Sequence, residues 1–169
     1  MLHPKTSGRL LNIFIAPPVG PYPPPAGGYD KILPMQEIEE AEVVVDMGIR
    51  GDRWFGVKEF KLPDGTLKLF PHDRQVSLMS VEDINSLGLD VQPIALRRNL
   101  LVDIPVNTLV GKQITIGEIV LVGTGLCKAC KHIEKYTVPG IISKMYDQGG
   151  LHTKVIKGGT IKQGDEICW

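Results

Sequence analysis

Two cysteines three positions apart are the first candidates for chemistry in this chain. Cys127 and Cys130 enclose Lys128, and Lys131 follows, so cations flank both thiols. A predicted strand precedes the pair and a predicted helix over 128–136 follows it. Because the N–H groups at a helix start and nearby cations lower the pKa of a thiol, we expect at least one reactive thiolate here.

The residues alone leave the chemistry of this pair open. A thioredoxin-type dithiol needs a βαβ context, which the surrounding hairpin pattern does not supply. A zinc site would have to recruit His132 and then His152 or Cys168, because the spacing lacks a second CxxC or HxxxH pair. A single cysteine that ligates a soft metal or carries sulfur is the third possibility. The structural alternative is two buried, inert thiols.

Basic and amide side chains form three short clusters that could bind an anion. They are Arg50 and Arg53 on a glycine-hinged loop, Arg74 and Gln75 before a predicted strand, and Arg97, Arg98 and Asn99 at a strand start. Guanidinium and amide groups bind phosphate and planar heterocycles through paired hydrogen bonds, so converging loops of this kind would form an anion site. The plainer alternative is local ion pairing, of Arg53 with Asp52 and of Arg98 with Asp103.

The elements that must position these side chains are mostly short strands. β-branched and alternating segments predict strands over 9–16, 41–47, 74–79 and 98–103, a hairpin over 111–122, and closing strands over 152–156 and 166–169. Short helices are predicted over 80–87, 128–136 and 140–147, and a stiff proline-rich loop over 17–28. Many short strands with glycine turns favour a mainly β barrel or sandwich, with the helices as plugs or lids.

Length and composition limit the class of protein. A chain of 169 residues suits a single domain over 1–169. Its 19 basic and 19 acidic residues cancel, so it lacks the overall positive charge typical of nucleic-acid binding. No segment approaches the roughly 18 apolar residues of a membrane span. An odd number of cysteines favours a reducing compartment. We therefore expect a cytoplasmic protein with no nucleic-acid partner and no membrane association.

Taken in order, the motifs become more specific than each is by itself. The succession is Gly48-x-x-Gly51-Asp52-Arg53, Arg74-Gln75-Val76-Ser77, Leu96-Arg97-Arg98-Asn99-Leu100, Cys127-x-x-Cys130, Gly149-Gly150 and Gly158-Gly159-x-Ile161-x-x-Gly164-Asp165. This order resembles the MOSC domain, which occurs at the C-terminus of molybdenum cofactor sulfurases and as small stand-alone proteins. The resemblance is strongest over 43–167. It implies a MOSC-type β-barrel of short antiparallel strands with a few short helices.

The resemblance also implies a site for the molybdenum–pterin cofactor, or for sulfur on its way to it. The family's invariant cysteine corresponds to Cys130, which would be the molybdenum ligand and the catalytic residue. Cofactor-binding roles fall on the arginine and amide side chains of the other motifs, Arg53, Arg74, Gln75, Arg97, Arg98 and Asn99. Two positions depart from the family pattern: Trp54 replaces a histidine and Gln148 replaces an arginine, which would alter access or remove an anion contact.

Two functions follow from the resemblance. The first is a molybdenum-dependent oxidoreductase that removes oxygen from N-oxygenated substrates, with electrons from a partner protein. The second is a carrier in which Cys130 holds a persulfide or the cofactor and delivers it to a molybdoenzyme or sulfurase partner. A module that has lost its site at Trp54 and Gln148 is a third possibility. We expect no pyridoxal phosphate, because these residues include no aminotransferase-like segment.

Overall fold

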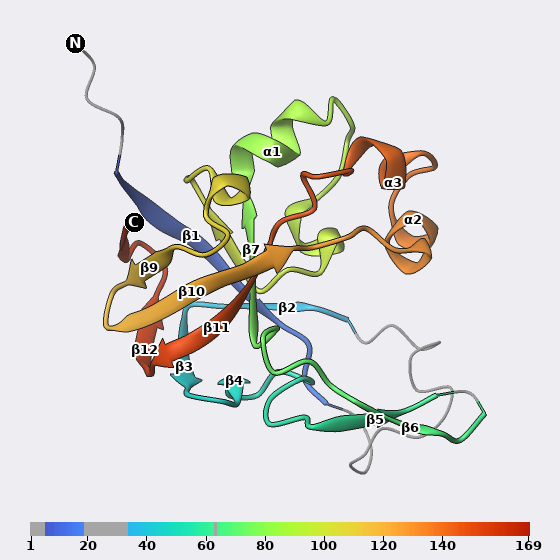
Figure 1. Cartoon of the computed structure of the whole chain (residues 1–169). Helices are drawn as coiled ribbons and strands as arrows, with labels where there is room; N and C mark the ends of the chain where they lie inside the picture. The colour runs from blue at the N-terminus through green and yellow to red at the C-terminus, as the bar shows by residue number, and fades with distance from the viewer. Residues whose placement is uncertain (1–5, 19–33, 63) are drawn as a thin grey trace.

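The structure, a computed structural model, describes residues 6–18, 34–62 and 64–169. A closed barrel dominates this part of the chain (Figure 1). Its strands are β1 (Ser7–Ile15), β7 (Val76–Ser80), β8 (Leu100–Val102), β9 (Gln113–Ile116), β10 (Ile119–Leu126), β11 (Leu151–Lys157) and β13 (Glu166–Cys168). They follow the order β13-β9-β10-β11-β7-β8-β1, and pairing between β13 and β1 closes the ring. The mainly β barrel fold with short helices is confirmed.

One pair of barrel strands departs from the expected antiparallel arrangement. Strands β7 and β8 run parallel, with Leu78 beside Leu100. Parallel neighbours need a crossover connection of a dozen or more residues. Here the crossover contains α1 (Val81–Ser86) and the 3₁₀-helix η1 (Pro93–Leu96). Arg98 and Asn99 lie at the end of this crossover, so the parallel pair decides where these two residues enter the sheet.

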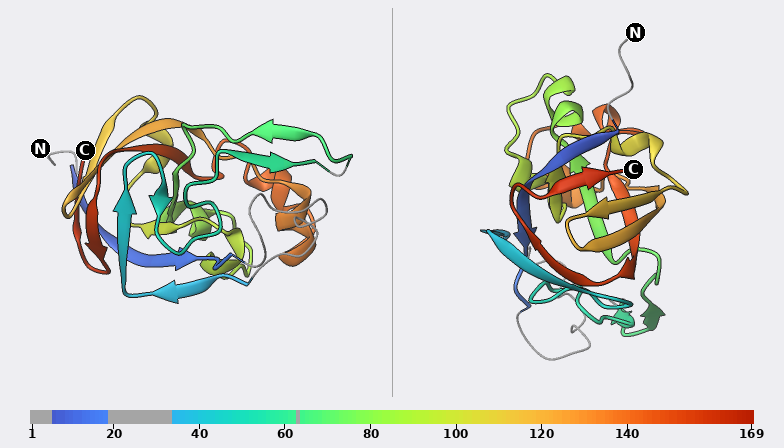
Figure 2. Two further views of the ribbon diagram at one scale, coloured as in Figure 1. Left: turned by 90° about the horizontal axis from the view of Figure 1, so that it is seen from below. Right: turned by 90° about the vertical axis from the view of Figure 1, so that its left-hand side faces the viewer.

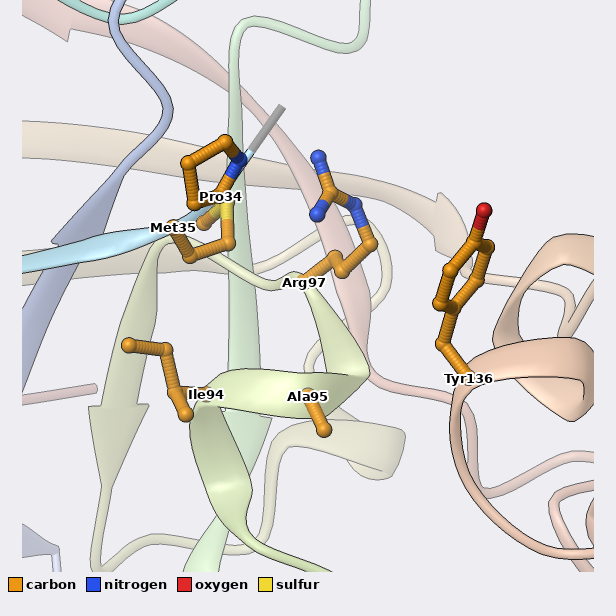
Figure 3. Close-up of a pocket in the computed structure, with 6 residues that line it drawn as sticks. All are labelled: Pro34, Met35, Ile94, Ala95, Arg97 and Tyr136. Atoms are coloured by element: carbon orange, nitrogen blue, oxygen red, sulfur yellow. The ribbon is translucent and has the colours of Figure 1, made fainter. Parts of the chain in front are cut away.

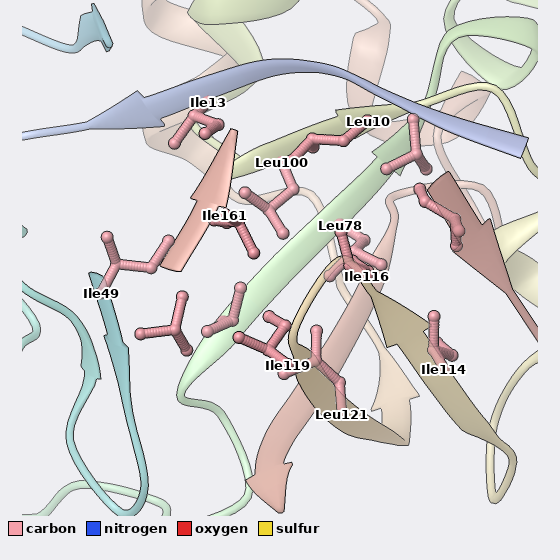
Figure 4. Packing of buried hydrophobic residues seen from close by; sticks show 14 of the residues in the cluster. Leu10, Ile13, Ile49, Leu78, Leu100, Ile114, Ile116, Ile119, Leu121 and Ile161 are labelled. Carbon is pink, nitrogen blue, oxygen red and sulfur yellow. The ribbon is translucent and has the colours of Figure 1, made fainter. Parts of the chain in front are cut away.

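The barrel interior is filled by alternating side chains of its strands. On β11, Leu151, Thr153 and Val155 are buried, whereas His152 and Lys154 are only partly covered. The same alternation on the other strands produces one apolar cluster of Leu, Ile and Val (Figure 4). Complete burial of one such side chain stabilises the fold by about 1.5–3 kcal/mol. Burial of this apolar cluster makes the barrel the most stable part of the fold.

Smaller sheets complete the β structure. Strand β2 (Gln36–Ile38) extends β1, and β3 (Glu40–Val44), β4 (Gly48–Ile49) and β12 (Gly159–Lys162) form a separate sheet. Strands β5 (Glu59–Lys61) and β6 (Leu67–Leu69) form a hairpin that projects from the barrel (Figure 2). The sequence does not predict β2, β5 or β6, because strands of three residues with few apolar positions give little periodic signal.

Short helices cover part of the outside of the barrel. In addition to α1, they are η2 (Val106–Thr108), α2 (Lys131–Tyr136) and α3 (Ile141–Lys144), and α2 lies beside α3 (Figures 1 and 2). Met79 and Leu101, on the outer faces of β7 and β8, form a second apolar cluster with Ile133, Ile141 and Met145. The three predicted helices are therefore confirmed. Beyond Pro18, the proline-rich loop predicted over 17–28 lies outside the described residues.

Candidate functional site: a guanidinium and thiol cluster beside the barrel

Arg98 joins the cysteine loop to the glycine pair that precedes β11. Its Nε donates a hydrogen bond to the carbonyl of Gly149 at 2.8 Å, and a terminal nitrogen donates to the carbonyl of Lys128 at 3.4 Å. Asp103, the acid proposed as its partner, instead accepts the backbone N–H of Arg9. The expectation that Arg98 pairs with Asp103 is therefore wrong. Arg98 positions backbone on both sides of the site.

The glycine pair permits a very close approach of backbone segments. A Cβ on Gly149 would lie 2.1 Å from the carbonyl oxygen of Cys127. A Cβ on Gly150, whose φ is +103°, would lie 2.4 Å from the carbonyl oxygen of Leu78. The N–H of Cys127 also donates to the Gly150 carbonyl at 2.8 Å. Only glycine fits these two positions, and together they fix the cysteine loop against the barrel.

Arg74 and Arg98 act on the same two groups, Cys127 and His152. Burial, and then the positive charges of Arg74 and Arg98, lower the pKa of His152 to about 4, while Asp73 opposes them. Burial raises the pKa of the Cys127 thiol, although Arg98 and Arg74 pull it down. Four side chains from separate segments thus gather in one neighbourhood. His152 is neutral at pH 7, so it can donate and accept a hydrogen bond there.

The two cysteines differ in exposure. Cys127 is 2% exposed, and burial raises the pKa of its thiol because desolvation outweighs the nearby cations. The prediction of at least one reactive thiolate therefore rests on Cys130. Cys130 is exposed and immediately precedes α2 as its N-cap residue. Of the two thiols, Cys130 is the one accessible to a metal, a cofactor or a second protein.

Asn99 and Gln75 use their amide oxygens inside the fold. The Asn99 side-chain oxygen accepts hydrogen bonds from the N–H and the hydroxyl of Ser77, both at 3.1 Å. The Nδ2 of Asn99 donates to the Phe14 carbonyl at 3.3 Å. The Gln75 oxygen accepts the N–H of Val155 at 2.8 Å. Each amide therefore holds neighbouring strands together. The Nε2 of Gln75 is buried without a hydrogen-bond partner among the described residues.

A polar row crosses the outer face of the sheet beside this cluster. On β11, His152 is in register with Gly125 of β10 on one side and with Ser77 of β7 on the other. The row continues from Ser77 to Asn99. A Cβ on Gly125 would meet open space, so the surface next to His152 is accessible. Neither His152 nor Ser77 is predicted from the sequence to belong to an anion site, although Ser77 lies within one recognised motif and His152 lies two residues after another.

Arg97 and Arg53 occupy other surroundings. Arg97, with a φ of +61°, ends η1 and lines a hollow of about 290 Å³ opposite Tyr136 (Figure 3). The Arg53 guanidinium lies 5.5 Å from the ring centroid of Trp54, which stacks on Phe70 at 4.8 Å. Trp54 also lines a second hollow of about 230 Å³ together with Arg74.

Two further residues explain local structure. Asp52 is buried and accepts the N–H groups of Ala16 at 2.9 Å and Trp54 at 3.1 Å, and its burial raises its pKa. It therefore shapes the loop that presents Arg53. Gln148 is exposed, and its side-chain oxygen accepts the hydroxyl of Ser86 at 3.3 Å. Gln148 thus precedes the glycine pair without entering the cluster.

The described part of the chain contains neither a cluster of metal ligands nor a membrane-spanning helix. No group of three or more His, Cys, Asp or Glu residues there is arranged to hold a metal ion. No helix there is long and apolar enough to cross a membrane. The zinc alternative for the cysteine motif therefore gains no support from these residues, while a single-thiolate site needs no such group.

The structure is a barrel of short strands with guanidinium groups beside a cysteine loop. The family model of the MOSC domain matches residues 64–168, so the chain belongs to the MOSC domain family. The family is associated with binding of the molybdenum cofactor. The matched residues include the cysteine motif and Arg98. Arg53 precedes them, so its assignment depends on the motif resemblance alone.

Solved structures share the fold. The YuaD protein from Bacillus subtilis superposes with a TM-score of 0.71 at 21% identity, covering 95% of this chain and 94% of that one. YiiM from Geobacillus stearothermophilus has a TM-score of 0.63 at 12% identity, covering 95% and 74%. YiiM from Escherichia coli has a TM-score of 0.57 at 15% identity, covering 93% and 68%. At these identities the likeness extends to the fold. No curated protein matches the chain.

Proposed function

We propose that this protein binds the molybdenum cofactor with Cys130 as the protein ligand of the metal, and that it reduces N-oxygenated substrates. The observation that carries the proposal is the convergence of Arg74 and Arg98 on Cys127 and His152, at the loop that ends in the exposed Cys130. A cationic neighbourhood beside one accessible cysteine suits an anionic, metal-bearing ligand.

The donor set fits the cofactor. Its phosphate needs guanidinium or backbone N–H partners, and Arg74 and Arg98 supply the former. The side-chain nitrogen of Gln75 is buried and has no partner among the described residues, so it is a further donor for a bound group. The close packing at Gly149 and Gly150 keeps the cysteine loop flat against the barrel.

Different residues of this chain would bind the metal, hold the cysteine loop and contact the ligand. When bound, the cofactor supplies a metal that accepts an oxygen atom and passes two electrons. Cys130 would hold the metal, while Arg98, through the carbonyls of Gly149 and Lys128, keeps the loop in place. The neutral imidazole of His152 would exchange a hydrogen bond with a ligand without adding a third positive charge. In the overall reaction an N-hydroxylated amine, two electrons and two protons give the amine and water.

The exposure of Cys130 also suits the second candidate, a carrier. A thiol at the surface can pass a persulfide sulfur or a cofactor to another protein, whereas an enclosed one cannot. The carrier and the reductase share the cysteine and its cationic neighbourhood. They differ in whether the protein turns over a substrate by itself when an artificial electron donor is present.

The test is the molybdenum content of protein from a host that makes the cofactor. We expect near-stoichiometric metal in the wild type, loss of metal in Cys130→Ala, and reduced metal in Arg98→Gln. Cys168→Ala is the matched control, because Cys168 is the other exposed thiol and lies on β13. Metal retained by Cys130→Ala would contradict the proposed ligand. Metal-free wild-type protein whose Cys130 gains a sulfur from a desulfurase would establish the carrier instead.

A further inference from the structure

The surface of α2 and α3 around Cys130 is positively charged. Lys128, Lys131, Lys135 and Lys144 are all exposed, and among the described residues no ion pair involves any of them. This segment also contains two acids: Glu134 is partly covered and its carboxylate accepts the backbone N–H of Gly140 at 3.1 Å, and Asp147, just after α3, is exposed. Four lysines thus outnumber two acids over 128–147, and the segment has a formal charge of +2.

Two acidic residues on β3 have cationic partners instead. On β3, Glu42 pairs with Arg50, and Glu40 pairs with Lys162 at 3.0 Å. The chain as a whole has zero formal charge. Neutrality of the whole therefore conceals a local excess of positive charge on the α2–α3 face, and the field of such a patch acts on an approaching molecule within about 10 Å at moderate salt.

Exposed aromatic side chains accompany the lysines. Tyr136 is 47% exposed at the end of α2, and Tyr146 is 78% exposed just after α3. The Lys135 ammonium lies 5.6 Å from the centroid of the Tyr136 ring. Figure 3 shows Tyr136 across the hollow from Arg97. Tyrosine is enriched in protein–protein interfaces because one end of its ring is apolar and the other forms hydrogen bonds.

We propose that the α2–α3 face is the docking surface for a partner protein with an acidic surface. Docking there would bring the partner to Cys130. The inference rests on the proposed function only in that Cys130 is the reacting group, and it holds for a reductase and for a carrier alike. Charge complementarity selects the occupant: lysines that form no ion pair among the described residues, gathered near one accessible thiol, attract carboxylates. Nucleic acid is the less suitable ligand, because the patch is small and the chain has no overall positive charge.

The first measurement concerns the electrostatic field at Cys130 itself. In a Cys168→Ser background, Cys130 reacts separately with a dianionic disulfide, dithiobis-nitrobenzoate, and with a cationic one, cystamine. The ratio of the two rates cancels the fraction of thiolate and reports the field. We expect the wild type to favour the anionic reagent by about 3- to 10-fold more than a small free thiol does, with the preference lost at high salt.

Lysine variants locate the source of that field. Lys131→Glu with Lys135→Glu should remove the preference for the anionic reagent. Lys157→Glu is the matched control: this lysine is exposed at the far end of β11, about 20 Å along the strand from Leu151. An equal loss in the control, or no preference in the wild type, would overturn the proposal.

The second measurement uses an acidic protein directly. A [2Fe–2S] ferredoxin with a strongly negative surface is titrated against the full chain at low and high ionic strength. We expect binding at low salt that weakens about 10-fold or more in the Lys131→Glu and Lys135→Glu double variant and is unchanged in Lys157→Glu. No binding at low salt, or tighter binding of a single-stranded oligonucleotide, would refute it. Neither readout requires molybdenum, so its failure is distinguishable from failure of the proposed function.

Discussion

The two faces of strands β7 and β8 are both buried, but they are covered in different ways. Leu78 and Leu100 face the interior of the closed barrel, where strand pairing continues around the whole ring. Met79 and Leu101 face outward and are covered by short helices. Helices of four to six residues, such as α2 and α3, are not stable by themselves in water. The helical cover therefore depends on its packing, whereas the barrel supports itself.

The candidate site lies across this division. Arg98, His152 and Cys127 are fixed to barrel strands or to backbone bonded to them. Cys130 precedes α2, on the helical cover. The more stable region therefore positions the charge of the site, while the accessible thiol belongs to the region that can adjust to a cofactor or a partner.

Substitutions in the barrel interior should lower the free energy of unfolding most. Leu100→Ala should lower the free energy of unfolding by about 3–5 kcal/mol, because neighbouring strands in a closed ring cannot collapse into the cavity. Met145→Ala, equally buried but in the second cluster, should cost less, about 2 kcal/mol, because short helices can shift inward. Urea unfolding measures both.

Leu69→Ala is the control. Because the Leu69 side chain is 75% exposed, its removal should change the free energy of unfolding by less than about 0.5 kcal/mol. Equal costs for Leu100→Ala and Met145→Ala would remove the distinction between barrel and cover. A greater cost for Met145→Ala would reverse it.

The next effect concerns His152, on the outer face of β11. Its pKa is lowered to about 4 in the folded protein from an ordinary value of 6.5, so its neutral form stabilises the fold above pH 6.5 and this stability is lost as pH falls toward 4. With solvent screening, we expect the loss to be about 1–2 kcal/mol by pH 4.5. His152→Gln, which does not titrate, should be correspondingly less sensitive to acid.

Urea unfolding of both proteins at pH 7.5 and pH 4.5 isolates this contribution. The difference between the two pH values should be smaller for His152→Gln, and Arg74→Gln should reduce it in the wild-type background by weakening the repulsion. The same pH dependence in wild type and His152→Gln would show that His152 is solvated and lies apart from the two guanidinium groups.

Much of the barrel could be predicted from the sequence because its signals are local. The alternation in 113–122 predicts the hairpin, and Ser80 followed by an acid predicts α1, both of which form. The parallel pairing of β7 with β8 could not be predicted this way, because it is decided by how a crossover of about twenty residues packs. Strands such as β5 and β6 are too short for periodicity to reveal.

The candidate site, like the barrel, could be predicted from the sequence only in part. The order of motifs indicates Cys130 and the arginine clusters, but not which members converge. Arg98 turns to backbone carbonyls rather than to Asp103, and burial raises the pKa of Cys127 against the effect of its cations. Desolvation and long-range contacts decide both outcomes, and neither can be read from spacing. His152 was missed as a partner of the arginines because its neighbours are far away in the sequence.

The smallest expected effect lies within the helical cover. Glu134→Ala removes the acceptor for the Gly140 N–H, which links α2 to the start of α3, and should lower the free energy of unfolding by about 0.5–1 kcal/mol. Glu134→Gln keeps an acceptor oxygen and should cost less. Hydrogen exchange should show faster exchange of amides in 131–145 in Glu134→Ala, with the amides of β10 and β11 unchanged. Faster exchange throughout the barrel would mean that cover and barrel open as one unit, and the division drawn between them would fail.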